Sequence, residues 1–171
     1  MRSVRAVRPR LATYIDDHLL GAFVAEELVM QCLERGFERH RPVLEAFLEE
    51  LREDRRELLA VQSALGFRTA LTKLVAGRIG GRLGRIGVKE KGLFFSPASN
   101  FLALEQIATG IDGKHALWLS FRVLAPNDER LRAFDFAGLA HRAERQRQTI
   151  EGLRRDAARL AFVHELHVPE P

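Results

Sequence analysis

The sequence predicts an all-α fold, an antiparallel four-helix bundle with an additional helix that crosses between its two hairpins. Three observations predict it. Apolar residues recur every three or four positions over four long stretches, glycine or proline stands at the ends of these stretches, and alternating strand-like segments are missing. A chain of 171 residues can enclose one core, so we expect a single domain over residues 1–171.

The first two helices are expected at about residues 10–35 and 42–65. Apolar residues keep a helical spacing from Leu11 to Leu33, and Gly36 stands where a helix-terminating glycine is common. Pro42 fits the first turn of the second helix, and Gly66 fits its end. Because the joint between the two is short, they should lie side by side and antiparallel.

The remaining helices are expected at about 69–86, 96–124 and 135–163. The third contains four glycines and would carry the chain back along the bundle. Ser96 and Pro97 form a strong start signal for the fourth, which the Ala125-Pro126-Asn127-Asp128 run interrupts. A short helical turn over 129–133 and the fifth helix follow. Residues 1–9 should form a basic arm, and residues 164–171 a tail.

Composition favours a cytoplasmic protein. Cys32 is the only cysteine, which excludes an internal disulfide and fits a reducing compartment. The basic N-terminus is not followed by the apolar stretch of a signal peptide, and no apolar run reaches the roughly 18 residues of a membrane span. The chain has 23 arginines but 4 lysines, with a net charge of +4. An arginine-rich surface can bind phosphates, but GC-rich coding produces the same bias.

Polar residues on the apolar stripes are the main chemical signal. His18 and Asp54 interrupt the stripes of the first and second helices, and burying either without a partner would cost a few kcal/mol. Glu105, Asp112 and His115 share a face of the fourth helix. Such carboxylates and imidazoles could hold iron, manganese or zinc. The candidate metal ligands are His18, Glu26, Asp54, Glu105, Asp112 and His115.

The same residues also fit purely structural pairs. In that interpretation His18 or an arginine pairs with Asp54, and Glu105 pairs with Arg142 or Arg147. Asp54 would have to be buried beside a donor from another helix. The aromatic residues of the second half of the chain are expected in the core or at the hairpin ends; these are Phe94, Phe95, Phe101, Trp118, Phe121, Phe134 and Phe136.

Two long helical hairpins with central carboxylates resemble the ferritin-like superfamily. The resemblance covers about residues 10–163 and rests on Glu26 or Glu27, Glu50 or Asp54, and Glu105. It implies a di-iron site made of two glutamates and two Glu-x-x-His pairs. The sequence departs from that pattern, because its only acid-x-x-His run is Asp112-Gly113-Lys114-His115 and the fifth helix offers the reverse order, His141-Arg142-Ala143-Glu144.

The glycine-rich segment 77–87 is the other candidate site. Its arginines, Arg78, Arg82 and Arg85, could bind a phosphate group, a protein partner or a membrane surface. The segment matches neither common nucleotide-binding glycine motif, and close helix packing through the glycines is the favoured explanation of it. Nucleic acid is not an expected partner.

Two functions remain open at this point. One is a non-enzymatic interaction or dimerisation module that forms a homo-oligomer or binds a protein. The other is a divergent metal-binding protein with the iron-handling or oxidoreductase role that the resemblance implies. No G-x-S-x-G motif is present, and Cys32 has no catalytic signature beside it, so the sequence identifies no catalytic residues.

Overall fold

Four long helices make up most of the computed structural model, which describes residues 9–34, 38–68, 97–164 and 166. They are α1 (Arg10–Glu34), α2 (Arg41–Ala64), α4 (Pro97–Leu124) and α5 (Phe136–Phe162). Three short 3-10 turns, η1 (Glu38–His40), η2 (Ala125–Asn127) and η3 (Glu129–Leu131), lie at the joints. Within these ranges there is no strand, which confirms the all-α prediction. The predicted third helix, with Arg78, Arg82 and Arg85, and the arm over residues 1–8 lie outside the described residues.

Local signals in the sequence explain the helix ends. Gly66 takes a φ of 74°, a conformation that favours glycine, and α2 ends just before it. Its N–H donates to Ser63 O at 2.9 Å while the N–H of Phe67 donates to Gln62 O at 3.0 Å, the two bonds of a Schellman motif. At the start of α5 the Asp135 side chain accepts from the N–H of Gly138 at 2.9 Å, which caps the first turn.

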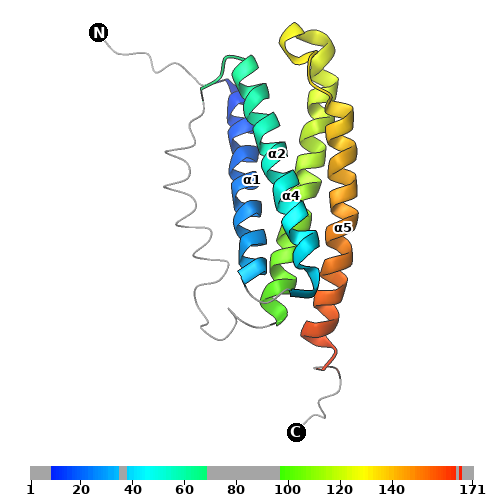
Figure 1. Ribbon diagram of the computed structural model, residues 1–171. Helices are drawn as coiled ribbons and strands as arrows, with labels where there is room; N and C mark the ends of the chain where they lie inside the picture. The colour runs from blue at the N-terminus through cyan, green and yellow to red at the C-terminus, as the bar shows by residue number, and fades with distance from the viewer. Residues whose placement is uncertain (1–8, 35–37, 69–96, 165, 167–171) are drawn as a thin grey trace, which may run out of the picture.

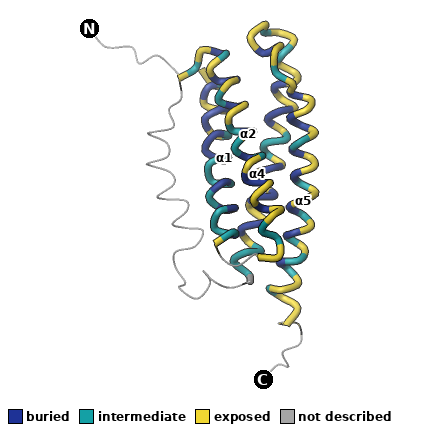
Figure 2. The backbone as a smooth tube through the Cα atoms, viewed as in Figure 1, coloured by how far each residue is buried: buried dark blue, intermediate teal, exposed yellow. Residues whose placement is uncertain are grey.

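The helices lie side by side in a single bundle (Figure 1). α1 and α5 run in one direction, and α2 and α4 run in the other. α4 makes its most extensive contact with α5, while α1 packs on both α2 and α4. The buried residues face the middle of the bundle and the exposed ones face outward (Figure 2). Each helix therefore contributes one face to a common core.

Aromatic side chains fill the core at the end where α4 passes to α5. The rings of Phe121 and Phe136 stack with centroids 5.3 Å apart, and Trp118 stacks on Phe136 at 6.2 Å. Phe134 adds a further stacked contact with Phe136 at 5.7 Å. These four residues confirm the expected packing at the hairpin end; Phe94 and Phe95 lie outside the described residues.

None of the described helices is both long enough and apolar enough to cross a membrane.

Candidate functional site

Five polar side chains from three helices meet inside the bundle. Glu50 and Asp54 come from α2, Lys114 from α4, and Arg142 and Gln146 from α5; we call this group the central polar layer. The residues of each pair from α2 and α5 are four positions apart, so both members lie on one face of their helix. The bundle thus places two carboxylates, two cations and one amide in contact.

Asp54 is the centre of this layer. It is 3% exposed, and its Oδ2 accepts from Lys114 Nζ at 2.5 Å and from Gln146 Nε2 at 3.2 Å. Its Oδ1 lies 3.0 Å from Arg142 Nε, in an ion pair that lacks hydrogen-bond geometry. The expectation that Asp54 is buried beside donors from other helices is confirmed, and the donors come from both α4 and α5.

Lys114 brings a positive charge into this low-dielectric region. Burial lowers the pKa of its ammonium group, and the nearby Arg142 acts in the same direction. Asp54 and Glu50 oppose this shift by attracting the charged form. The carboxylate of Asp54 and the ammonium of Lys114 therefore depend on each other for charge compensation.

Gln146 connects the charged groups without adding charge. It is 2% exposed; its Oε1 accepts from Lys114 Nζ at 2.5 Å, and its Nε2 donates to Glu50 at 2.8 Å and to Asp54. The amide thus accepts on one side and donates twice on the other. Arg142 extends the layer outward, because Nη1 of its guanidinium donates to Glu53 Oε2 at 2.9 Å.

Two further polar contacts join α1 to α2. Asp16 and Gln62 are both 1% exposed, and Gln62 Nε2 donates to Asp16 Oδ1 at 2.7 Å. Glu26 binds the guanidinium of Arg55 through two contacts, at 2.5 Å and 3.4 Å. These contacts give the α1–α2 pair its own register, separate from the central polar layer.

The six candidate metal ligands do not gather at one place. Glu26 and Asp54 belong to different clusters, and Glu105 and Asp112 are exposed on α4, where Asp112 Oδ1 binds Arg147 at 3.0 Å. His115 is half-buried on the same helix. Among the residues that the structure describes, no three histidine, cysteine, aspartate or glutamate side chains are close enough to hold a metal ion together.

No protein-family model, curated protein or solved structure matches the chain.

His18 lies between α1 and α4 rather than beside Asp54. Its ring packs edge-on against Tyr14, with centroids 4.6 Å apart. The imidazole lies beside Gly113 of α4, where an added Cβ would be in ordinary van der Waals contact, 4.0 Å from the His18 Cε1. Burial lowers the pKa of His18, and Asp17 opposes the shift. The residue is therefore part of the α1–α4 packing.

The predicted salt bridges are correct in part. Arg142 does pair with Asp54, as the expectation of an arginine partner requires. Neither Arg142 nor Arg147 has an ion pair with Glu105. Arg142 binds Glu53 and Asp54. Arg147 binds Asp112 and Glu151. The charge of Glu105 acts instead on Arg154. Glu105 thus raises the pKa of Arg154, about two turns beyond Arg147 on α5, through its charge alone.

Two members of the central polar layer, Lys114 and Gln146, were not predicted from the sequence. Lys114 stands between the acid and the histidine of the 112–115 run, and it continues the buried spacing of Ile107, Ile111 and Trp118. Gln146 likewise lies between Ala143 and Ile150 on the buried face of α5. A polar residue in phase with buried apolar neighbours is the signal that would have identified both.

Proposed function

We propose that this chain is a ferritin-like helical bundle that works without a metal, as a cytoplasmic, non-enzymatic interaction or dimerisation module. One observation carries the proposal: the ammonium of Lys114 lies 2.5 Å from both Asp54 Oδ2 and Gln146 Oε1 in the middle of the bundle. It supplies the positive charge where the resemblance would put a metal ion.

A metal at Asp54 would have to displace both of its cationic partners. Lys114 and Arg142 already compensate the Asp54 carboxylate. Separating a buried ion pair leaves a charge without compensation, which destabilises the native state. In addition, Gln146 uses its amide group on Lys114, Glu50 and Asp54. The layer is thus chemically complete with the side chains that form it.

The course of the chain supports a ferritin-like arrangement. α1 and α2 are antiparallel, α4 and α5 are antiparallel, and α2 ends at the opposite end of the bundle from the start of α4 (Figure 1). Ferritin-like bundles join two such hairpins by one long crossover connection. This order of directions differs from that of a simple up-down-up-down bundle.

Exposed apolar residues at the end of α5 support an interaction role. Leu160 is 67% exposed and Leu166 is 79% exposed, and the part-exposed Phe162 and Val163 lie between them in the sequence; we call these four residues the α5-end patch. Clustered exposed apolar side chains are typical of protein–protein contact sites. A second copy of the chain that covers this patch would remove them from water.

Metal analysis tests the metal-free part of the proposal. Protein purified without a histidine tag should contain only substoichiometric iron, manganese and zinc, and adding each metal should leave its melting temperature unchanged. A ligand that binds only the native state stabilises it by about 2.7 kcal/mol at a hundredfold excess over the dissociation constant. A metal-dependent rise in melting temperature would contradict the proposal.

Light scattering coupled to gel filtration tests the dimerisation part. The parent protein should elute as a dimer, and a Leu160→Asp, Leu166→Asp variant as a monomer. The control carries Ala137→Asp and Gln148→Asp, which add the same charge on the exposed outer face of α5. It should remain dimeric. A parent that stays monomeric at its highest soluble concentration would contradict the dimerisation proposal.

A further inference from the structure

The junction between α2 and α5 contains a groove beside the central polar layer. These two helices approach each other less closely than the other neighbouring pairs, and long side chains bridge them. The groove has a volume of about 440 Å³ and is lined by Val43, Ala46 and Phe47 of α2 and by Arg145, Gln146 and Thr149 of α5. We call it the Phe47 groove. Its volume lies in the range of small-molecule sites, roughly 300–1,000 Å³.

The two walls of the Phe47 groove differ in chemistry. The α2 wall is apolar except for Glu50, and Val43 in it is 40% exposed. The α5 wall is polar, and the buried Gln146, which donates to Glu50 at 2.8 Å, closes the groove toward the core. A ligand that fits both walls must have an apolar part and a polar part.

Arg145 differs from the other arginines of its helix. Arg142, Arg147, Arg154, Arg155 and Arg159 each have a carboxylate partner. In the part of the chain that the structure describes, no side chain pairs with the Arg145 guanidinium. Thr149 does not engage it, because its hydroxyl donates to the Arg145 backbone oxygen at 3.1 Å.

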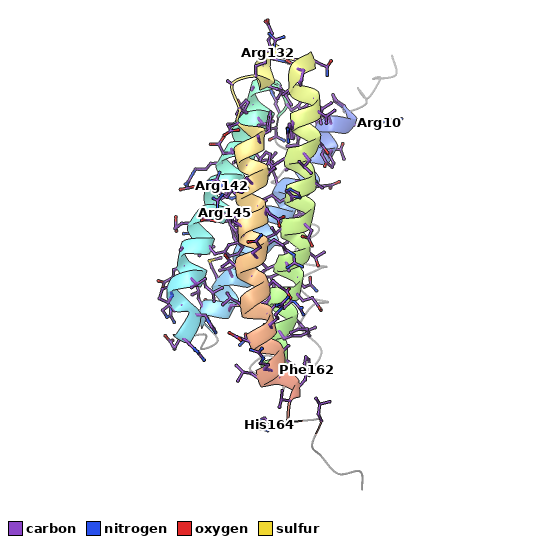
Figure 3. The ribbon with its side chains drawn as sticks, turned by 90° about the vertical axis from the view of Figure 1, so that its right-hand side faces the viewer. Arg10, Arg132, Arg142, Arg145, Phe162 and His164 are labelled. Carbon is purple, nitrogen blue, oxygen red and sulfur yellow. The ribbon has the colours of Figure 1, made fainter. Side chains whose placement is uncertain are left out.

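The position of Arg145 adds to this difference. The residue lines the Phe47 groove and also a second groove of about 430 Å³ near Leu139 and Phe134, further along the same helix pair. Figure 3 shows Arg145 beside Arg142 on α5. The other charged residue of the Phe47 groove, Glu50, is held by Gln146 and lies close enough to Lys114 to influence its pKa. Among the residues that line the groove, Arg145 is therefore the charged side chain that is left to bind a ligand.

We propose that the Phe47 groove binds a small amphipathic carboxylate. Its apolar part lies against Val43, Ala46 and Phe47, and its carboxylate is bound by the guanidinium of Arg145. A guanidinium matches a carboxylate with two parallel hydrogen bonds, which are stronger than bonds between neutral groups. This site goes beyond the proposed function, since it needs neither the α5-end patch nor the absence of a metal.

Titration with octanoate tests the site. By isothermal calorimetry octanoate should bind the parent saturably with one site per chain, and octanol, which has the same apolar part without the charge, should bind at least about tenfold more weakly, or 1.4 kcal/mol. Arg145→Gln should weaken octanoate binding by a similar factor. Ala46→Leu, which adds apolar bulk at an exposed position of the groove, should abolish it.

Arg155→Gln is the matched control. It removes the same charge from an exposed arginine that does not line the groove, so octanoate should bind this variant as it binds the parent. Circular dichroism should show that all variants keep the parent's helix content. Equal octanoate affinity in the parent and in Arg145→Gln, undiminished binding to Ala46→Leu, or no saturable binding to the parent would each overturn the proposal. The metal and dimer tests leave this result unaffected, so the two proposals fail separately.

Discussion

The aromatic end of the bundle and its central polar layer both involve α4 and α5, but they stabilise the bundle in different ways. At the aromatic end, Trp118, Phe121 and Phe136 are at most 3% exposed, and the first two both stack on Phe136. In the polar layer, Asp54 and Gln146 are just as buried but form directional contacts with Lys114. Burial of apolar side chains stabilises in proportion to the area removed from water, whereas a buried charge is tolerated only beside its partner. The aromatic end should therefore contribute most of the stability, and the polar layer should fix how the helices are aligned.

The largest effect is expected at the aromatic end. Phe121→Ala should lower the free energy of unfolding by about 3–5 kcal/mol, because it removes a fully buried ring and leaves a cavity between α4 and α5. Urea denaturation followed by circular dichroism measures this. Val123→Ala is the control: its side chain is 73% exposed on the same helix, and its loss should change stability by less than about 0.5 kcal/mol. Similar losses for the two variants would mean that α4 does not pack with Phe121 buried and Val123 exposed.

A smaller effect is expected in the polar layer. Asp54→Ala should cost on the order of 1–3 kcal/mol, because Lys114 and Arg142 lose the carboxylate that compensates them. The matched control is Asp112→Ala, which breaks an exposed ion pair with Arg147 and should cost at most about 1 kcal/mol. If Asp54→Ala melts like the parent, this carboxylate does not hold the layer together.

The sequence predicted the helices more completely than the polar layer. Pro97 and Gly66 mark helix ends through their own backbone preferences, so α2 and α4 begin and end within about a residue of expectation. Asp54 was predicted to be buried because the spacing of apolar residues within its own helix is enough to place it on the buried face. Lys114 and Gln146 belong to the layer because of how α4 and α5 are turned toward α2, and helical spacing does not specify which residues on neighbouring helices meet.

A substitution on the exposed face of α4 should stabilise the protein by less than about 1 kcal/mol. Gly110→Ala should raise the free energy of unfolding by about 0.5–1 kcal/mol, because alanine is the better helix former and the new Cβ would meet nothing within 4 Å. Thermal denaturation measures the change. Gly66→Ala is the opposite case, since its φ of 74° strains any other residue, and it should be destabilising. A loss with Gly110→Ala would show that this face of α4 is covered.

The smallest effect is a dependence of stability on pH. Burial lowers the pKa of His18 from its ordinary value of 6.5, so the unfolded chain binds a proton more readily than the native one. Stability should therefore fall as the pH drops below about 6.5, by an amount that His18→Gln removes. Denaturation of the parent and of this variant at pH 7.5 and 5.5 measures the difference. An equal pH dependence in both would mean that His18 is not buried against Gly113.

A double-mutant cycle between Asp54 and Lys114 tests the central claim most directly. The parent, Asp54→Asn, Lys114→Met and the double variant are unfolded with urea, once with a metal chelator and once with added zinc or manganese. The account predicts a coupling free energy of about 0.5–3 kcal/mol that stabilises the native state and is the same in both conditions, because Lys114 is itself the counter-charge of Asp54. A coupling near zero, or one that changes when metal is added, would contradict it.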